Sequence, residues 1–167
     1  MKLAKTIKSA LTAAALGFLA LSLAPTAAVA ATATTTFAVT ATVQATCSVT
    51  ATAMGFGTYV STAASLTTST VTVTCTNTTP YTVGLDAGTA TGATVTTRKM
   101  VNGSALLNYA LYSDSARTAN WGNTNPSWVS GTGNGAAQPL TVYGEVAANQ
   151  YVTPGSFTDT ITATVTY

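Results

Sequence analysis

Short runs in which apolar and polar side chains alternate recur along the chain. The first is Thr34–Val43, where every second position from Phe37 on is apolar and the residues between are Thr or Ala. Its apolar positions are Phe37, Val39, Ala41 and Val43. A period of two is that of a β-strand with one apolar face. Such a strand can pair within its own domain or add to the open sheet edge of a neighbouring molecule, and the pattern leaves both alternatives open.

The later alternating runs predict an all-β protein. Leu106–Tyr112 is apolar on both faces, which indicates a central strand, and it follows the tight-turn signal Asn102-Gly103. Ser113–Gln138 is rich in Asn, Gly and Ser and predicts loops with one short strand. Strands are expected at Thr46–Thr52, Phe56–Val60, Ser69–Thr76, Tyr81–Asp86, Arg98–Val101, Leu106–Tyr112, Leu140–Val146 and Phe157–Tyr167. This number of short strands in one domain predicts a β-sandwich.

The longest of these runs, Phe157–Tyr167, places apolar residues and Asp159 on one face and Thr on the other. It also ends the sequence, so no later element is expected to cover its part of the sheet. A missing strand would then come from another molecule or from Thr34–Val43.

Residues 1–30 have the composition of a secretory signal peptide. Three lysines in the first eight residues precede the apolar run Leu11–Leu23, and Ala28-Val29-Ala30 offers a small-x-small cleavage pattern. We expect cleavage between Ala30 and Ala31. A membrane anchor is the alternative, but the apolar run is short for a span of about 20 residues and Pro25 interrupts its end.

Removing 30 residues from 167 leaves 137, which is enough for one domain. This part carries three basic and four acidic residues, a formal charge of −1, so it has no basic patch and nucleic acid is not an expected partner. Thr accounts for 35 of these residues. Few charges and many hydroxyl groups are typical of an extracellular protein that packs against copies of itself rather than of a cytoplasmic monomer.

The two cysteines, Cys47 and Cys75, are expected to form a disulfide because the chain is exported and the count is even. Closing the loop between them would stabilise the fold by roughly 3–4 kcal/mol. A metal site or a nucleophile would need His or acidic companions, and the sequence has no His. We therefore expect no enzymatic activity, no metal and no cofactor.

Five other polar or aromatic residues have two interpretations each. Asp114 and Arg117 are expected to form a local ion pair or to brace a loop, and Asp159 to be a strand-edge carboxylate bonded to a loop. Two acidic residues could form a glycosidase pair, but nothing places two of the four together. Trp121 and Trp128 could bind sugars from exposed loops, although the favoured interpretation is that one or both close the end of the core.

Five blocks of the sequence resemble the Spore Coat Protein U domain family, the pilin subunits of archaic, Csu-type chaperone–usher pili. Each block is weakly specific, whereas their order and spacing over Ala31–Tyr167 are more so. The blocks are Gln44–Cys47, Val73–Cys75, Leu111–Thr118, Tyr143–Val146 and Pro154–Tyr167. No role is assigned to Asn120–Gln138, where family members vary.

The resemblance implies an incomplete immunoglobulin-like sandwich, residues 45–167, preceded by an N-terminal donor strand segment, residues 31–44. A periplasmic chaperone would lend a strand to the sandwich, and an outer-membrane usher would exchange it for the N-terminal strand of the next subunit. The donor residues would be Phe37, Val39, Ala41 and Val43.

The function implied is that of a structural pilus subunit, a shaft or adaptor subunit, in a surface fibre for attachment and biofilm formation. The fibre would be a polymer of this chain or of related pilins, outside the cell. The alternative is a secreted carbohydrate-binding or spore-coat-like structural module that no usher assembles.

Overall fold

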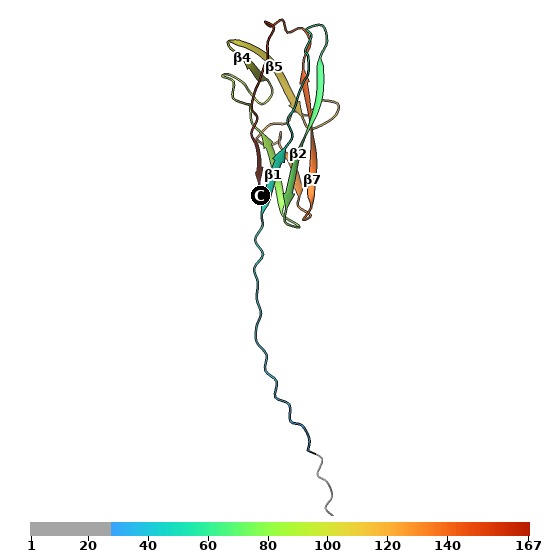
Figure 1. The fold of residues 1–167 in the computed structure, drawn as a ribbon, viewed down its shortest axis with the longest axis vertical. Coiled ribbons are helices and arrows are strands. Elements are labelled where there is room, and N and C mark those ends of the chain that lie inside the picture. The colour runs from blue at the N-terminus through green and yellow to red at the C-terminus, as the bar shows by residue number, and fades with distance from the viewer. Residues whose placement is uncertain (1–27) are drawn as a thin grey trace, which may run out of the picture. The chain divides into compact units, whose positions relative to one another are not determined.

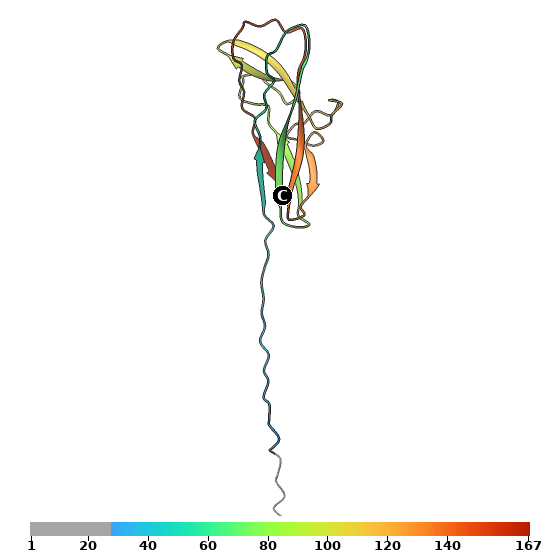
Figure 2. The same ribbon diagram turned by 45° about the vertical axis from the view of Figure 1, so that its right-hand side comes forward.

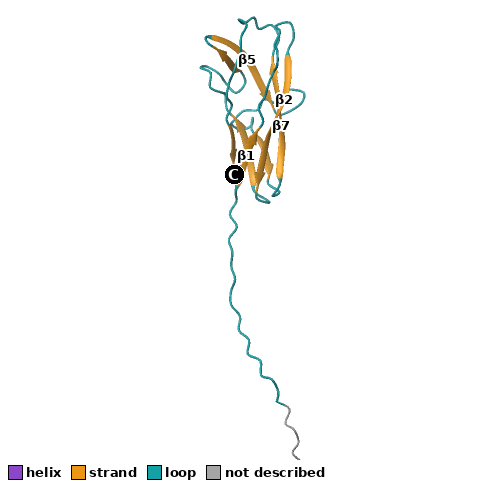
Figure 3. Ribbon diagram, in the orientation of Figure 1, coloured by secondary structure: helices purple, strands orange, loops and turns teal. Residues whose placement is uncertain are grey.

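The computed structural model describes residues 28–167, which contain strands and loops but no helix (Figure 1, Figure 3). Accordingly, this part of the chain offers no helix long and apolar enough to cross a membrane. The predicted signal peptide lies outside the described residues apart from its last three positions. The chain divides into two units, Met1–Thr40 and Ala41–Tyr167, and every strand found in residues 28–167 belongs to the second.

The strands of the second unit form two sheets with antiparallel pairing throughout. The larger sheet has the order β1 (Cys47–Ala51), β2 (Ser65–Cys75), β7 (Ala137–Val146), β5 (Ala105–Tyr112) and β4 (Arg98–Asn102). The smaller has the order β6 (Val129–Thr132), β3 (Pro80–Leu85) and β8 (Ala163–Thr166). The predicted all-β class is confirmed.

The core forms from the alternating positions of these strands. In β2, Val71, Val73 and Cys75 are buried while the Thr residues between them are not, and β3 and β5 repeat the pattern. The other buried hydrophobic side chains are Tyr81, Val83, Leu85, Leu107, Tyr109, Leu111, Trp121, Val142 and Val146. A strand that buries every second residue can cover one face of a sandwich while its β-branched Thr residues occupy the wet face.

Cys47 and Cys75 are bonded, as predicted from the compartment and the even count. The two residues lie directly opposite each other in the β1–β2 ladder, with 4.1 Å between their Cα atoms. The disulfide therefore ties the edge strand β1 to its only neighbour in the sheet.

Most predicted strands are confirmed, and Leu106–Tyr112 corresponds to β5, which has a neighbour on each side. Ser113–Gln138 contains one complete short strand, β6, as expected. The strand predicted at Phe56–Val60 is wrong, because these residues belong to a loop. The next strand along the chain, β2, has both edges taken by β1 and β7, so it offers this alternating segment no free edge. Phe56 instead packs its ring edge-on to Tyr109, with centroids 5.9 Å apart.

The predicted strand Phe157–Tyr167 is confirmed only for Ala163–Thr166. The preceding residues, 157–162, are extended and still alternate between half-buried and exposed side chains, but no continuous ladder pairs them. These residues thus have the side-chain pattern of a strand, although only Thr158 forms a bridge to a neighbouring strand.

Candidate functional site: an open groove between β1 and β8

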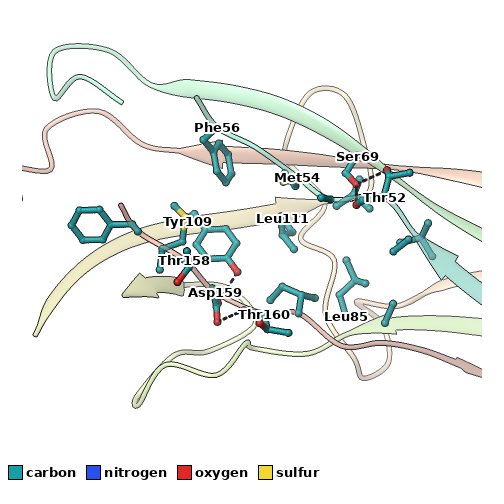
Figure 4. Close-up of a pocket in the computed structure, with 18 residues that line it drawn as sticks. Thr52, Met54, Phe56, Ser69, Leu85, Tyr109, Leu111, Thr158, Asp159 and Thr160 are labelled. Atoms are coloured by element: carbon teal, nitrogen blue, oxygen red, sulfur yellow. Dashed lines mark hydrogen bonds between the residues drawn. The ribbon is translucent and has the colours of Figure 1, made fainter. Parts of the chain in front are cut away.

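A groove of about 400 Å³ opens between the end of β1 and the segment that leads into β8 (Figure 4). These two edge strands, one from each sheet, lie side by side in both ribbon views (Figure 1, Figure 2). Core residues form the floor, and segments 51–56 and 157–163 form the two walls. The floor residues are Val71, Leu85, Tyr109, Leu111 and Val142. A core that reaches the surface along a groove leaves apolar area that a further element could cover.

The groove continues into a wider hollow of about 870 Å³. Met54, Phe56, Met100 and Phe157 line both, so the two form one continuous depression. Loops 54–61 and 150–157 line the wider part.

The wall before β8 presents unpaired backbone groups to the groove. The backbone of Thr158 exchanges hydrogen bonds with that of Val101, and the backbone of Thr162 bonds to Asp86. The backbone N–H and C=O groups of these even-numbered residues therefore point away from the groove. No backbone hydrogen bond is made by Phe157, Asp159 or Ile161 within residues 28–167. Because backbone groups alternate in direction along a strand, these odd-numbered N–H and C=O groups face the open side. They form a row of donors and acceptors that a further strand could use.

The opposite wall has the same arrangement. The Thr52 N–H donates to the Thr70 carbonyl in β2, and the Thr46 carbonyl accepts the N–H of Thr76, just after β2. In the register of the β1–β2 ladder, the backbone groups of the even-numbered residues thus point toward β2. The backbone groups of Cys47, Val49 and Ala51 consequently point away from β2, and Ala51 lines the groove. Each wall of the groove is thus an unpaired strand edge.

Side-chain hydrogen bonds hold each wall in place. Thr52 and Ser69 join the end of β1 to β2, because the Ser69 hydroxyl donates to the Thr52 carbonyl and the two hydroxyl groups lie 3.0 Å apart. On the other side, the Asp86 carboxylate accepts the N–H of Thr162 at 2.9 Å. Each wall is therefore held by hydrogen bonds to a neighbouring part of the same domain.

Asp159 is the one carboxylate that lines the groove. It accepts the Tyr109 hydroxyl and the Thr160 N–H, each at 2.8 Å (Figure 4). It also accepts the backbone N–H and the hydroxyl of Thr89, each at 2.9 Å. Partial burial acts to raise the pKa of Asp159, but these hydrogen bonds outweigh it and hold the pKa below its ordinary value. Asp159 is thus a charged strand-edge carboxylate bonded to a loop, as predicted, and its partners occupy both oxygens.

Tyr109 is the buried member of this contact. Burial, together with the hydrogen bond to Asp159, raises the pKa of the Tyr109 hydroxyl. The hydroxyl therefore keeps its proton at neutral pH and acts as a donor. The Tyr109 hydroxyl and the Asp159 carboxylate form a polar bridge in an otherwise apolar groove. This bridge narrows the groove at the position of Asp159.

The predicted donor residues lie in residues 28–46, which belong to no strand. Phe37, Val39 and Val43 have more than four fifths of their surface exposed, and Ala41 is exposed as well. Three large apolar side chains in contact with solvent leave apolar surface that a packing partner could cover.

Trp121 is buried in the core, and its indole N–H donates to the Val83 carbonyl at 2.9 Å. Its burial agrees with a packing role and leaves Trp121 unavailable to a sugar. Trp128 is about one third exposed. Asp114 braces its loop by accepting the N–H groups of Thr118 and Ala119, and it makes no ion pair with Arg117.

Two residues of importance were missed by sequence reasoning, Tyr109 and Arg98. Arg98 is fully buried, and its guanidinium donates to four carbonyl oxygens, including those of Leu85 and Trp121. Its position at the start of a short polar run gave no signal of burial. Among the described residues, no group of three or more His, Cys, Asp or Glu side chains is placed to hold a metal ion.

Comparison with known proteins agrees with this architecture. The model of the Spore Coat Protein U domain matches residues 33–164. Protein U of Myxococcus xanthus is 38% identical over 86 residues, which are 50% of this chain and 48% of that protein. The chain thus spans about half the length of the curated relative it matches.

A solved structure has a similar fold. It is a chain of the CsuC–CsuE chaperone–tip adhesion subunit pre-assembly complex from archaic chaperone–usher Csu pili of Acinetobacter baumannii. The TM-score is 0.57 at 22% identity, over 75% of this chain and 41% of that one. The two antiparallel sheets and this likeness confirm the predicted immunoglobulin-like sandwich. By the match over residues 33–164, the chain belongs to the Spore Coat Protein U domain family.

Proposed function

We propose that this chain is a structural subunit of a surface fibre and that it polymerises by β-strand addition. The observation that carries the proposal is the groove, whose walls are two unpaired strand edges and whose floor is the hydrophobic core. Residues 31–44 of one copy supply the complementary element, an uncharged segment with alternating apolar side chains. Insertion would pair its backbone with both walls and place Phe37, Val39, Ala41 and Val43 over the core.

The energetics favour insertion. Full burial of Phe37, Val39 and Val43 contributes on the order of 1.5–3 kcal/mol for each side chain. The odd-numbered backbone groups of residues 157–161 and 47–51 gain partners at the same time, with a net gain of about 0.5–1.5 kcal/mol for each hydrogen bond. Repeated at each joint, these terms give a fibre that dissociates slowly although no covalent bond joins its subunits.

The proposal includes the export route. Cleavage between Ala30 and Ala31 would free the donor segment after secretion, and a periplasmic chaperone would occupy the groove until an outer-membrane usher exchanges it for the next subunit. The structure with a similar fold comes from a chaperone–subunit complex, which supports a chaperone as partner. The fibre would serve attachment and biofilm formation at the cell surface.

The test is the behaviour of the secreted chain by itself. Size-exclusion chromatography of residues 31–167 should give polymers or aggregates, because the open groove exposes apolar surface and unpaired backbone. Deleting Ala33–Val43 should leave a subunit that accepts a chaperone strand but does not extend a fibre. A stable monomer that keeps its fold without these residues and binds no added strand would refute the proposal.

A further inference from the structure

We propose a specific register for the inserted strand: Ala41 of one copy lies directly opposite Asp159 of the next, in an antiparallel ladder with the segment that leads into β8. The same register places Phe37 opposite Ala163, Val39 opposite Ile161 and Val43 opposite Phe157. This inference rests on the proposed function, and it identifies the occupant of the groove as residues 35–43 of a second copy.

The direction follows from the sheets themselves. All six pairs of neighbouring strands in this domain are antiparallel. An antiparallel strand next to β8 continues that arrangement in the smaller sheet and runs along the full length of the open edge. Its direct partners are residues whose side chains point to the same face.

Two alternating patterns, one in the wall segment and one in the donor segment, determine whether odd-numbered residues lie opposite odd-numbered or even-numbered ones. The residues 157, 159 and 161 turn their side chains toward the groove and are also the ones with unpaired backbone groups. An odd-numbered donor residue must therefore lie opposite an odd-numbered wall residue, because a shift by one would turn Phe37 and Val39 into solvent. Only shifts by two residues remain as alternatives.

The sizes of the side chains decide among those alternatives. The Tyr109–Asp159 bridge narrows the groove at Asp159, so the smallest donor residue, Ala41, fits at that level. The largest donor residue, Phe37, then meets the smallest wall residue, Ala163. A shift by two residues in either direction places a valine against the charged carboxylate of Asp159. Both oxygens of this carboxylate already accept hydrogen bonds, and a carboxylate makes no favourable contact with an apolar side chain.

Disulfide trapping tests the register at positions that face away from the core. The register places Thr40 opposite Thr160, both exposed, in a pair of the non-hydrogen-bonded type. The native disulfide occupies a pair of the same type, with Cα atoms 4.1 Å apart. Full-length protein carrying Thr40→Cys and Thr160→Cys should therefore form, under mild oxidation, a ladder of covalent oligomers on a non-reducing gel.

The matched controls combine Thr40→Cys with Thr158→Cys or Thr162→Cys, which trap the registers shifted by two. We expect these to give at least tenfold less cross-linked dimer than the Thr160 pair, with equal secretion. A dominant ladder from either control would overturn the register while leaving strand addition intact. A cross-linked monomer from the Thr160 pair would overturn the second copy as occupant. No cross-link in any of the three, together with monomeric protein, would refute the proposed function itself.

Discussion

Replacing Val39 by Asp separates the joining of subunits from their folding. Val39 is 83% exposed in the isolated chain, so the substitution costs the subunit little stability. In the proposed joint the same side chain lies over the core opposite Ile161. The substitution should therefore reduce fibre formation while leaving secretion and the native disulfide unchanged.

The magnitude follows from two terms. The joint loses about 1.5–3 kcal/mol from the valine that is no longer buried. A carboxylate without a partner in an apolar site becomes protonated, and protonating Asp at pH 7 from an ordinary pKa of about 3.9 costs roughly 4 kcal/mol. The sum of about 6 kcal/mol weakens each joint by more than a thousandfold, since 1.4 kcal/mol corresponds to a factor of ten.

The matched control is Thr40→Asp, which adds the same charge at the neighbouring position on the opposite face of the strand. Fibre yield and the resistance of fibres to heating in detergent are the measurements. Val39→Asp should give almost no fibres at pH 7 and recover in part at pH 5, where protonation costs less, whereas Thr40→Asp should assemble at both pH values. Equal assembly by the two variants, with equal secretion, would show that Val39 does not face the core of a neighbour.

Three further predictions concern the stability of the subunit and use urea unfolding of the secreted chain at low concentration. Replacing Cys47 and Cys75 by Ala should lower the free energy of unfolding by roughly 3–4 kcal/mol, and an unchanged urea midpoint would contradict the role given to the disulfide. Tyr109→Phe should cost about 1.5 kcal/mol at pH 7, because the charged Asp159 loses a donor. The pKa of Asp159 is depressed in the folded state, so this contribution is present above the unfolded pKa and is lost as the pH falls through the folded value. A difference between the two proteins that does not shrink as the pH is lowered would refute the explanation. Arg98→Met should cost about 3–5 kcal/mol, since four carbonyl groups lose their donor and two of these hydrogen bonds are buried. A loss below about 1 kcal/mol would show that water replaces the guanidinium.

The class of the fold could be predicted because the buried residues follow the strand period. Val71, Val73 and Cys75 alternate with Thr in the sequence and are buried in the structure. The same logic predicted Phe56–Val60 wrongly, because periodicity reports which side chains can face a core and not whether a neighbouring strand is free. There the apolar side chains serve as packing residues of a loop, and Phe56 contacts Tyr109.

The polar details of the groove could not be predicted, because they depend on residues brought together from distant parts of the chain. Asp159 meets Thr89 and Tyr109 across separations of 70 and 50 residues. Arg98 collects carbonyl groups from three loops or strand ends, which no local pattern encodes. Only the charge of Asp159 on an apolar face marked that position as unusual.

The segment Phe157–Ile161 shows most directly why sequence and structure differ in this domain. Its alternation is that of a buried strand, yet its odd-numbered backbone groups have no partner in the described part of the chain. A strand pattern reflects every environment for which a sequence was selected, whereas a single chain displays only the pairings that it can make alone. The same holds for residues 34–43, which alternate like a strand and belong to none. The first segment lines a groove that no strand fills, and the second has the pattern of a strand without a partner. In the proposed joint between two copies, each of these segments supplies the partner that the other lacks.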